Sequence, residues 1–205
     1  MIIELFGLPG SGKTSLARTL AQEPGFEVIK IRSKKELVFY NLVFFGRNPF
    51  RFLRLLGWVL GNIGHRKLFY LKIMNAFFND NAKYEKARRY SRAILDQGYF
   101  QNVLSLFEGE LDKEKLKDYI KIIPKPDWLF ILDLPPEERE RRIKERGFFS
   151  REKMGEKYLE GWRKVLSRNY QLFFDILPDL SIKYVVLDGG ETSEILANEI
   201  KRTVL

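Results

Sequence analysis

The sequence has 205 residues, 45% of them hydrophobic and 31% charged, and a net charge of +9. This length supports one sizeable domain with a hydrophobic core, and it is short for two. The absence of cysteine and the single histidine exclude disulfides, thiol chemistry and histidine-rich metal sites. The excess of basic over acidic residues suits polyanionic ligands, a class that includes nucleotides, nucleic acid and anionic membranes. No run approaches the roughly 18 apolar residues of a transmembrane helix, and no signal peptide is indicated, so we expect a cytoplasmic protein.

Five short apolar runs are typical of β-strands, and helical patterns separate them. The runs cover residues 2–6, 27–31, 93–96, 128–133 and 183–188. They lack regular polar alternation, as strands buried on both faces of a sheet do. Alternating strands and helices predict an α/β fold with a parallel sheet and right-handed crossovers. In such a fold, ligands bind at the carboxyl ends of the strands.

A glycine-rich segment, residues 7–14, follows the first strand and precedes a helical pattern over 14–21. Its sequence GLPGSGKT fits G-x-x-x-x-G-K-[ST] at every fixed position. A loop in this context binds phosphate, because its N–H groups and the positive end of the helix dipole face the anion. Lys13 would contact the β- and γ-phosphates, and the Thr14 hydroxyl would ligate Mg²⁺. The predicted nucleotide-binding residues of this phosphate loop are Gly7, Pro9, Gly10, Ser11, Gly12, Lys13 and Thr14.

The connection between the second and third strands is unusually long. Helical patterns cover 49–62, 66–80 and 81–92, and they contain many aromatic residues with basic residues between them. An insertion of this length is normally functional. Three interpretations stay open: a packed core, a groove for a bulky or lipid-like acceptor, and a membrane-facing surface. Arg32, Arg47 and Arg51 are candidates for clamping an anionic acceptor.

Asp96 directly follows the third strand, in the sequence ILDQG. An aspartate there can hold Mg²⁺ through water, which makes Thr14 and Asp96 the predicted metal site. An ordinary turn is the alternative. If the acceptor is a hydroxyl group, Asp96 is the first candidate base and Glu36 the second, whereas a phosphate acceptor needs none.

An arginine-rich helix follows the fourth strand and begins with proline, which is favourable in the first turn. Arg139, Arg142 and Arg146 are three and four residues apart, so they share one helical face. Their guanidinium groups can stabilise a transferring phosphoryl group, although a solvated helix with Glu–Arg pairs is the alternative. Residues 147–153 are expected to form a lid that carries Arg151.

The phosphate loop, Asp96 and the segment LDLPPEERERRIKERG (residues 132–147) together resemble the P-loop nucleoside and nucleotide kinases. The thymidylate kinase-like subgroup is the most similar, and the resemblance covers both ends and the whole second half of the chain. It implies a three-layer P-loop NTPase fold with a five-stranded parallel sheet in the order 2-3-1-4-5. A single domain over 1–205 would contain a helical insertion at about 33–92.

The same resemblance assigns roles to individual residues. Arg142 would pack near the adenine of ATP, Arg146 would contact the donor phosphates, and Asp188 and Gly189 would lie in the adenine-contact loop. The predicted catalytic residues are Lys13, Asp96, Arg142, Arg146 and Arg151. Two segments depart from the subgroup on the acceptor side. Residues 96–98 are Asp-Gln-Gly instead of Asp-Arg and an aromatic residue, and 32–36 are RSKKE instead of a sequence like Arg-Glu-Pro-Gly-Gly.

The predicted function is therefore ATP- and Mg²⁺-dependent phosphoryl transfer to a small acceptor, with a nucleoside or nucleotide as the first choice. One alternative is a kinase for a sugar or a lipid-linked membrane precursor. A second is a non-catalytic NTP-binding protein, which the basic charge would suit. The expected partner is a small-molecule phosphate acceptor and no specific nucleic acid. Contact with a membrane surface and a homodimer are left open.

Overall fold

The computed structural model of the protein describes residues 1–62, 68–107, 109–146 and 155–205. Five parallel strands form one sheet in the order β2-β3-β1-β4-β5, which confirms the predicted order. The strands are β1 (Ile2–Phe6), β2 (Phe26–Val28), β3 (Arg92–Leu95), β4 (Trp128–Asp133) and β5 (Tyr184–Asp188). β2 is shorter than the predicted run 27–31, because its pairing with β3 ends where Val28 lies opposite Ile94.

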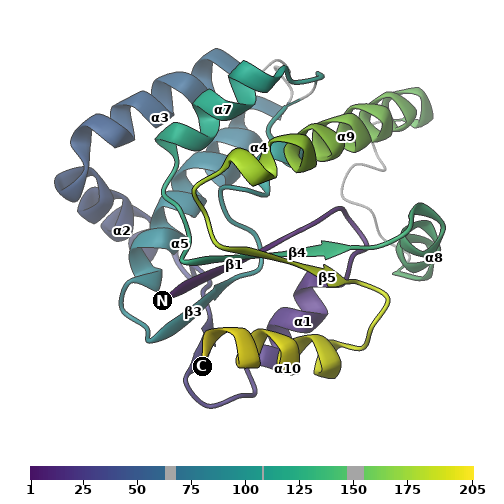
Figure 1. Ribbon diagram of the computed structural model, residues 1–205. Helices are drawn as coiled ribbons and strands as arrows, with labels where there is room; N and C mark the ends of the chain where they lie inside the picture. Colours follow the sequence, from purple (N-terminus) through teal and green to yellow (C-terminus); the bar gives the residue numbers. More distant parts are fainter. Residues whose placement is uncertain (63–67, 108, 147–154) are drawn as a thin grey trace.

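Helices cover both faces of the sheet (Figure 1). α1 (Lys13–Leu20) and α10 (Ser193–Val204) pack together on one face. Ile3 and Leu5 of β1 point into the core on that side. Successive side chains of a strand point to opposite faces, so Glu4 and Phe6 face the helices on the other side. There α9 (Glu156–Ile176) brings Phe173 to within 4.5 Å of Phe6, measured between ring centroids.

The helical insertion consists of α2 (Lys34–Arg47), α3 (Pro49–Asn62), α4 (Phe69–Ile73), the π-helical turn η2 (Met74–Asn79) and α5 (Asp80–Ala87). The helix predicted over 49–62 is confirmed with the same bounds. The helical patterns did not indicate α2, which Ser33 caps by accepting a hydrogen bond from the Glu36 N–H at 3.1 Å. The predicted break between 66–80 and 81–92 is wrong, because α4, η2 and α5 follow one another without a gap.

All eight residues of α5 are buried, including four charged ones. Buried charges are tolerated when they are paired or hydrogen-bonded, and the two lysines of α5 find partners on the loops that follow β2 and β3. The Lys83 amine donates to the Gln97 carbonyl at 2.8 Å, and the Lys86 amine donates to the Lys30 carbonyl at 2.7 Å. α5 therefore joins the insertion to the carboxyl edge of the sheet.

The remaining elements are α6 (Asn102–Ser105), α7 (Lys113–Ile122), α8 (Pro136–Arg146) and the 3₁₀ turn η4 (Leu177–Asp179). α8 begins at the predicted proline, directly beyond the carboxyl end of β4. α10 is capped by Thr192, whose hydroxyl accepts a hydrogen bond from the Ile195 N–H at 3.4 Å. In the part of the chain that the structure describes, no helix combines the length and hydrophobicity needed to cross a bilayer.

Candidate active site

The phosphate loop connects β1 to α1 and depends on glycine at two positions. Gly10 and Gly12 have φ angles of 86° and 92°, a left-handed conformation that side chains with a Cβ rarely adopt. A Cβ on Gly10 would lie 2.9 Å from the Arg139 carbonyl oxygen, so α8 packs directly on the loop. α1 begins at Lys13, and the N–H groups of its first turn have no intrahelical acceptor. The loop thus offers free N–H donors beside a helix N-terminus, which suits a phosphate.

The Lys13 side chain is folded back into this loop. Its amine donates to the carbonyls of Gly7 at 2.8 Å and Leu8 at 3.0 Å, and to the Ser11 hydroxyl at 3.3 Å. Burial lowers the pKa of Lys13 to about 7, while the negative charge of Asp96 acts in the opposite direction. A polyanion bound in the loop would favour the charged form of this amine.

Asp96 immediately follows β3 and is half-buried. Its charge acts on Lys13, which is consistent with a position on the same side of the sheet edge as the phosphate loop. Thr14, the other predicted metal ligand, is exposed in the first turn of α1. Among the described residues, no three acidic or histidine side chains gather to hold a metal ion. One carboxylate with phosphate oxygens and waters is the donor set that Mg²⁺ commonly uses, so these residues fit the predicted ion.

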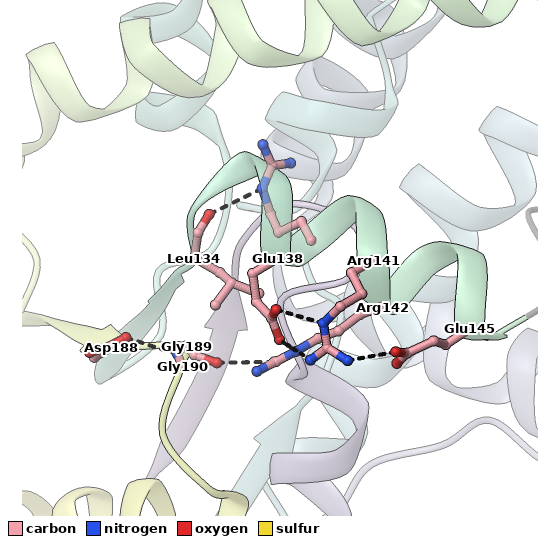
Figure 2. Close-up of polar contacts among 9 residues, drawn as sticks. Leu134, Glu138, Arg141, Arg142, Glu145, Asp188, Gly189 and Gly190 are labelled. Carbon is pink, nitrogen blue, oxygen red and sulfur yellow. Dashed lines mark hydrogen bonds and ion pairs between the residues drawn. The ribbon is translucent and has the colours of Figure 1, made fainter.

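Arg142 of α8 joins the phosphate loop to the loop after β5 (Figure 2). Its guanidinium donates to the Gly189 carbonyl at 3.0 Å and to the Glu138 carboxylate at 2.9 Å. The same guanidinium lies 3.6 Å from the position that a Cβ on Gly12 would occupy. Next to it, the Asp188 carboxylate accepts a hydrogen bond from the Gly190 N–H at 2.8 Å. The predicted adenine-side residues Arg142, Asp188 and Gly189 are therefore neighbours.

Two other arginines of α8 differ in position. Arg141 is 59% exposed and pairs within its own helix with Glu138 and Glu145, so for this residue the solvated-helix alternative holds (Figure 2). Arg139 donates to the Leu134 carbonyl at 3.1 Å, and its charge lowers the pKa of Lys13. Arg139 thus lies close to the phosphate loop, although it is not among the predicted catalytic residues. Its spacing of three residues from Arg142 was the available signal.

Three predictions fall at or beyond the end of α8. Arg146 is the last residue of α8, and its side chain is not among those described. The predicted lid over 147–153 and Arg151 lie outside the described residues. Their roles stay predictions.

Glu4 is a buried site residue that the sequence analysis missed. It lies on β1, and its carboxylate accepts hydrogen bonds from the Tyr84 hydroxyl at 2.6 Å and the Phe100 N–H at 2.7 Å. Burial raises the pKa of Glu4 to about 7. Gly98 packs closely against it, because a Cβ there would lie 2.7 Å from the carboxylate. An acidic residue inside an otherwise apolar strand was the signal for this interaction.

Residues 96–101 form the loop that Glu4 anchors, and the far end of this loop reaches the phosphate loop. The Gln101 side-chain carbonyl accepts a hydrogen bond from the Gly7 N–H at 3.4 Å. The Glu4 carboxylate also accepts one from the Gln101 N–H at 3.3 Å. Asp96 therefore stands on a segment that is held at one end by β3 and at the other by Glu4 and Gly7.

A second buried polar cluster follows the π-helical turn. The Asp80 carboxylate accepts a hydrogen bond from the Asn102 amide at 2.9 Å, and the Tyr99 hydroxyl donates to the Asn81 side chain. Burial raises the pKa of Asp80 to about 6. π-helical turns occur often at functional sites, and this one lies in the segment where we predicted the acceptor.

The three candidate acceptor arginines are all exposed, and their surroundings differ. Arg47 forms an ion pair with the buried carboxylate of Glu85. The Arg32 N–H donates to the Glu36 carboxylate at 2.6 Å. Burial raises the pKa of Tyr99, and the charge of Arg51 acts in the opposite direction. The hydrogen bond from Arg32 and another from Lys86 lower the pKa of Glu36, which makes it a weak base.

The chain is similar to a family profile, to curated proteins and to solved structures. A family profile described as "ATPase family associated with various cellular activities (AAA)" matches residues 3–43. A probable thymidylate kinase of Thermococcus kodakarensis is 28% identical over 209 residues, which cover 98% of this chain and 95% of that protein. A probable thymidylate kinase 1 of Saccharolobus solfataricus is 27% identical over 204 residues, covering 98% and 95%.

The solved structure of deoxyadenosine kinase from M. mycoides with bound dATP has a TM-score of 0.60 and 16% identity, and it covers 100% of this chain and 99% of that one. The same enzyme with the products dCMP and dCDP has a TM-score of 0.56, 15% identity and coverage of 100% and 98%. These structures establish the shared fold. With the curated relatives, they confirm the predicted resemblance to P-loop nucleotide kinases of the thymidylate kinase-like kind, and with it the phosphotransferase class.

Proposed function

We propose that this protein transfers the γ-phosphoryl group of ATP, in the presence of Mg²⁺, to a nucleoside or nucleotide. The observation that carries the proposal is Lys13, a buried amine that donates to loop carbonyls at a helix N-terminus. The charge of Asp96, which follows the adjacent strand β3, favours the charged form of this amine. Similarity to proteins named thymidylate kinase over 98% of the chain supports the acceptor class.

The donor nucleotide would be held by the backbone of the phosphate loop and by two long side chains. Lys13 exchanges its bonds to the Gly7 and Leu8 carbonyls for the β- and γ-phosphate oxygens, and phosphate binding keeps its amine charged. Arg142, fixed by Gly189 and Glu138, offers its flat guanidinium beside the predicted adenine position. These residues orient the donor before transfer.

Thr14 and Asp96 would hold Mg²⁺, Asp96 through water. When bound, the ion neutralises charge on the phosphate oxygens. The role of Asp96 on the acceptor side depends on the acceptor: a hydroxyl needs a base within hydrogen-bonding distance, and a phosphate does not. The anchor at Glu4 would fix the position of Asp96 for either role.

A second candidate acceptor is a sugar or a lipid-linked precursor, and Gly98 favours it. Thymidylate kinases usually have arginine and an aromatic residue after the aspartate. Here a Cβ at position 98 would lie 2.7 Å from the Glu4 carboxylate, so a side chain at this position would displace Glu4. This departure in sequence on the acceptor side supports keeping a different acceptor as the second candidate.

A product assay separates the candidates. The protein is incubated with ATP and either Mg²⁺ or EDTA, together with thymidine monophosphate, deoxyadenosine, deoxycytidine or a sugar panel, and products are identified by mass spectrometry. We expect Mg²⁺-dependent phosphorylation of a nucleoside or nucleotide. Phosphorylation of a sugar alone would support the second candidate. Binding of ATP without transfer to any acceptor would contradict both and support a non-catalytic protein.

A further inference from the structure

Arg139 of α8 has a different set of partners from the neighbouring arginines. Arg141 and Arg142 both form ion pairs with Glu138. Among the residues that the structure describes, the Arg139 side chain forms one hydrogen bond, from its Nε to the Leu134 carbonyl at 3.1 Å, and no ion pair. A guanidinium has five N–H donors, so the two terminal nitrogens of Arg139 are available to a ligand. This arginine is therefore unlike its neighbours on a helix that is rich in glutamate.

The backbone of Arg139 is held against the phosphate loop. A Cβ on Gly10 would lie 2.9 Å from the Arg139 carbonyl oxygen, which leaves little space between the loop and α8. The Arg139 N–H donates to the Pro135 carbonyl at 3.1 Å, and its Nε donates to the Leu134 carbonyl, in the segment directly after β4. These contacts fix the first turn of α8 at the carboxyl edge of the sheet, where ligands bind in this type of fold.

The charge of Arg139 acts on two titratable groups from different elements. Burial lowers the pKa of Lys13, and the charge of Arg139 lowers it further. Burial raises the pKa of Tyr170 on α9, and the charge of Arg139 acts in the opposite direction. The Tyr170 ring stacks on Phe6, the residue before the phosphate loop, with 5.8 Å between the ring centroids. The Arg139 guanidinium therefore lies near the Lys13 amine, where the phosphate loop meets α9.

Two cations at close range repel each other, and an anion between them removes this repulsion. The charge of Asp96 favours the charged form of Lys13. No carboxylate in the described part of the chain is bonded to Arg139. Phosphate oxygens match both cations, because a guanidinium binds phosphate through paired hydrogen bonds and a lysine binds it as a point charge. Lys13 and Arg139 together therefore fit a polyanion.

The γ-phosphate is the part of the donor that Arg139 is placed to contact. The Arg142 guanidinium is bonded to the Gly189 carbonyl, on the predicted adenine side. Arg139 lies three residues earlier, about 4.5 Å closer to the start of the helix, and its charge acts on Lys13, the residue predicted to contact the β- and γ-phosphates. On the basis of the proposed function, we propose that Arg139 is a catalytic residue whose terminal nitrogens bind the γ-phosphoryl group and stabilise its charge during transfer.

Arg139 contributes charge and hydrogen bonds to this step and gives up no proton, since a guanidinium stays protonated. The bond between the γ-phosphorus and the β,γ-bridging oxygen breaks, the electron pair of that bond stays on ADP, and an acceptor oxygen forms the new bond to phosphorus. A hydroxyl acceptor would give its proton to Asp96, and a phosphate acceptor needs no base. The alternative is a structural arginine that only closes the first turn of α8 on Leu134.

Calorimetry without an acceptor tests the contact, because ADP and adenosine 5′-(β,γ-imido)triphosphate differ at the γ-phosphate. With Mg²⁺ present, Arg139→Ala should lower the affinity for the imidotriphosphate by about tenfold or more and change the affinity for ADP by less than about twofold. Arg139→Lys keeps the charge but lacks the guanidinium fork, so an intermediate loss is expected. The control Lys144→Ala removes the same charge from an exposed position of α8 and should leave both affinities unchanged.

Turnover and thermal melts separate a catalytic arginine from a structural one. With an acceptor that the unmodified protein phosphorylates, Arg139→Ala should lower kcat by about a hundredfold, with little change in the KM for the acceptor. Unchanged affinity for the imidotriphosphate, or equal losses for ADP and the imidotriphosphate, would overturn the proposal. If Arg139→Ala does not fold, Arg139→Lys gives the same comparison. Failure of the proposed function would instead appear in the unmodified protein, as ATP binding without transfer to any acceptor.

Discussion

The phosphate loop and the helical insertion both contact the carboxyl edge of the sheet, but they present different groups there. The phosphate loop presents backbone N–H groups, left-handed glycines and one lysine. The insertion presents buried side chains of α5, which reach the loops after β2 and β3 through Lys86 and Lys83 and reach β1 through Tyr84. A backbone cradle is prescribed by a short motif, whereas a side-chain network depends on residues that are distant in sequence. This difference explains why the donor side is easier to recognise than the acceptor side.

Removing the lysine amine tests the phosphate-loop side most severely. We expect Lys13→Ala to lower turnover with ATP and Mg²⁺ by about a thousandfold, because a preorganised charge on the transferring phosphates is lost. The fold should persist, since burial already disfavours the charged amine. Steady-state kinetics beside a thermal melt measure both effects, with Arg18→Ala, an exposed change on the same helix, as the control. Turnover close to that of the unmodified protein would refute the role of the loop.

Glu4 tests the contact between the insertion and the sheet, because it accepts a hydrogen bond from Tyr84 of α5. Burial raises the pKa of Glu4 from 4.5 to about 7. A raised carboxyl pKa means that the folded state favours the protonated form. The associated stability is fully present below the unfolded pKa and is lost as pH rises through about 7. Its size is on the order of 3 kcal/mol.

Glu4→Gln keeps a neutral hydrogen-bonding group at this position, so the free energy of unfolding should depend less on pH. Urea unfolding at about pH 5 and about pH 8 measures this dependence in both proteins. Asp80 also has a raised pKa and contributes in the same direction in both. Its charge raises the pKa of Glu4, so the difference between the two proteins measures Glu4 together with this interaction. Identical pH profiles in the two proteins would show that the Glu4 carboxyl group stays neutral over this pH range or is exposed to solvent.

Asp96 lies where the two sides meet. We expect Asp96→Asn to weaken Mg²⁺-dependent turnover between about tenfold and a hundredfold, as losses of metal-shell partners do. ATP affinity should change little, because the loop and Arg142 still hold the nucleotide. Magnesium titrations of kcat, with calorimetry for ATP, separate the two quantities, and Asp118→Asn on α7 is the exposed control. A matched loss of ATP affinity and turnover would place Asp96 outside the metal shell.

The smallest effect is expected at Arg142. Arg142→Lys removes the flat guanidinium and its bond to the Gly189 carbonyl. The KM for ATP should rise several-fold, and the KM for the acceptor should not change. Arg141→Lys is a neighbouring control on the same helix, since Arg141 contacts only Glu138 and Glu145 among the described residues. If both variants behave alike, the bridge from α8 to the loop after β5 has no role in binding ATP.

The strand order and the phosphate loop could be predicted because their signals are local. A glycine motif between a strand and a helix fixes that loop, and apolar runs without alternation indicate a parallel sheet. The positions of Glu4 and Tyr84 could not be derived, because 80 residues separate these partners. The break predicted near residue 80 was also wrong, since a π-helical turn leaves no glycine or proline signal.

The π-helical turn of residues 74–79 has an evolutionary consequence. A π turn holds one more residue than an α turn, and one residue corresponds to about 100° of rotation. Because the wider turn takes up this extra residue, deleting a single residue here would leave a continuous α-helix in which Phe69, Tyr70 and Leu71 keep their direction relative to the buried side chains of α5. Related chains that differ by this one-residue deletion would therefore keep both the polar contacts of Asp80 and Tyr84 and the exposed surface of α4.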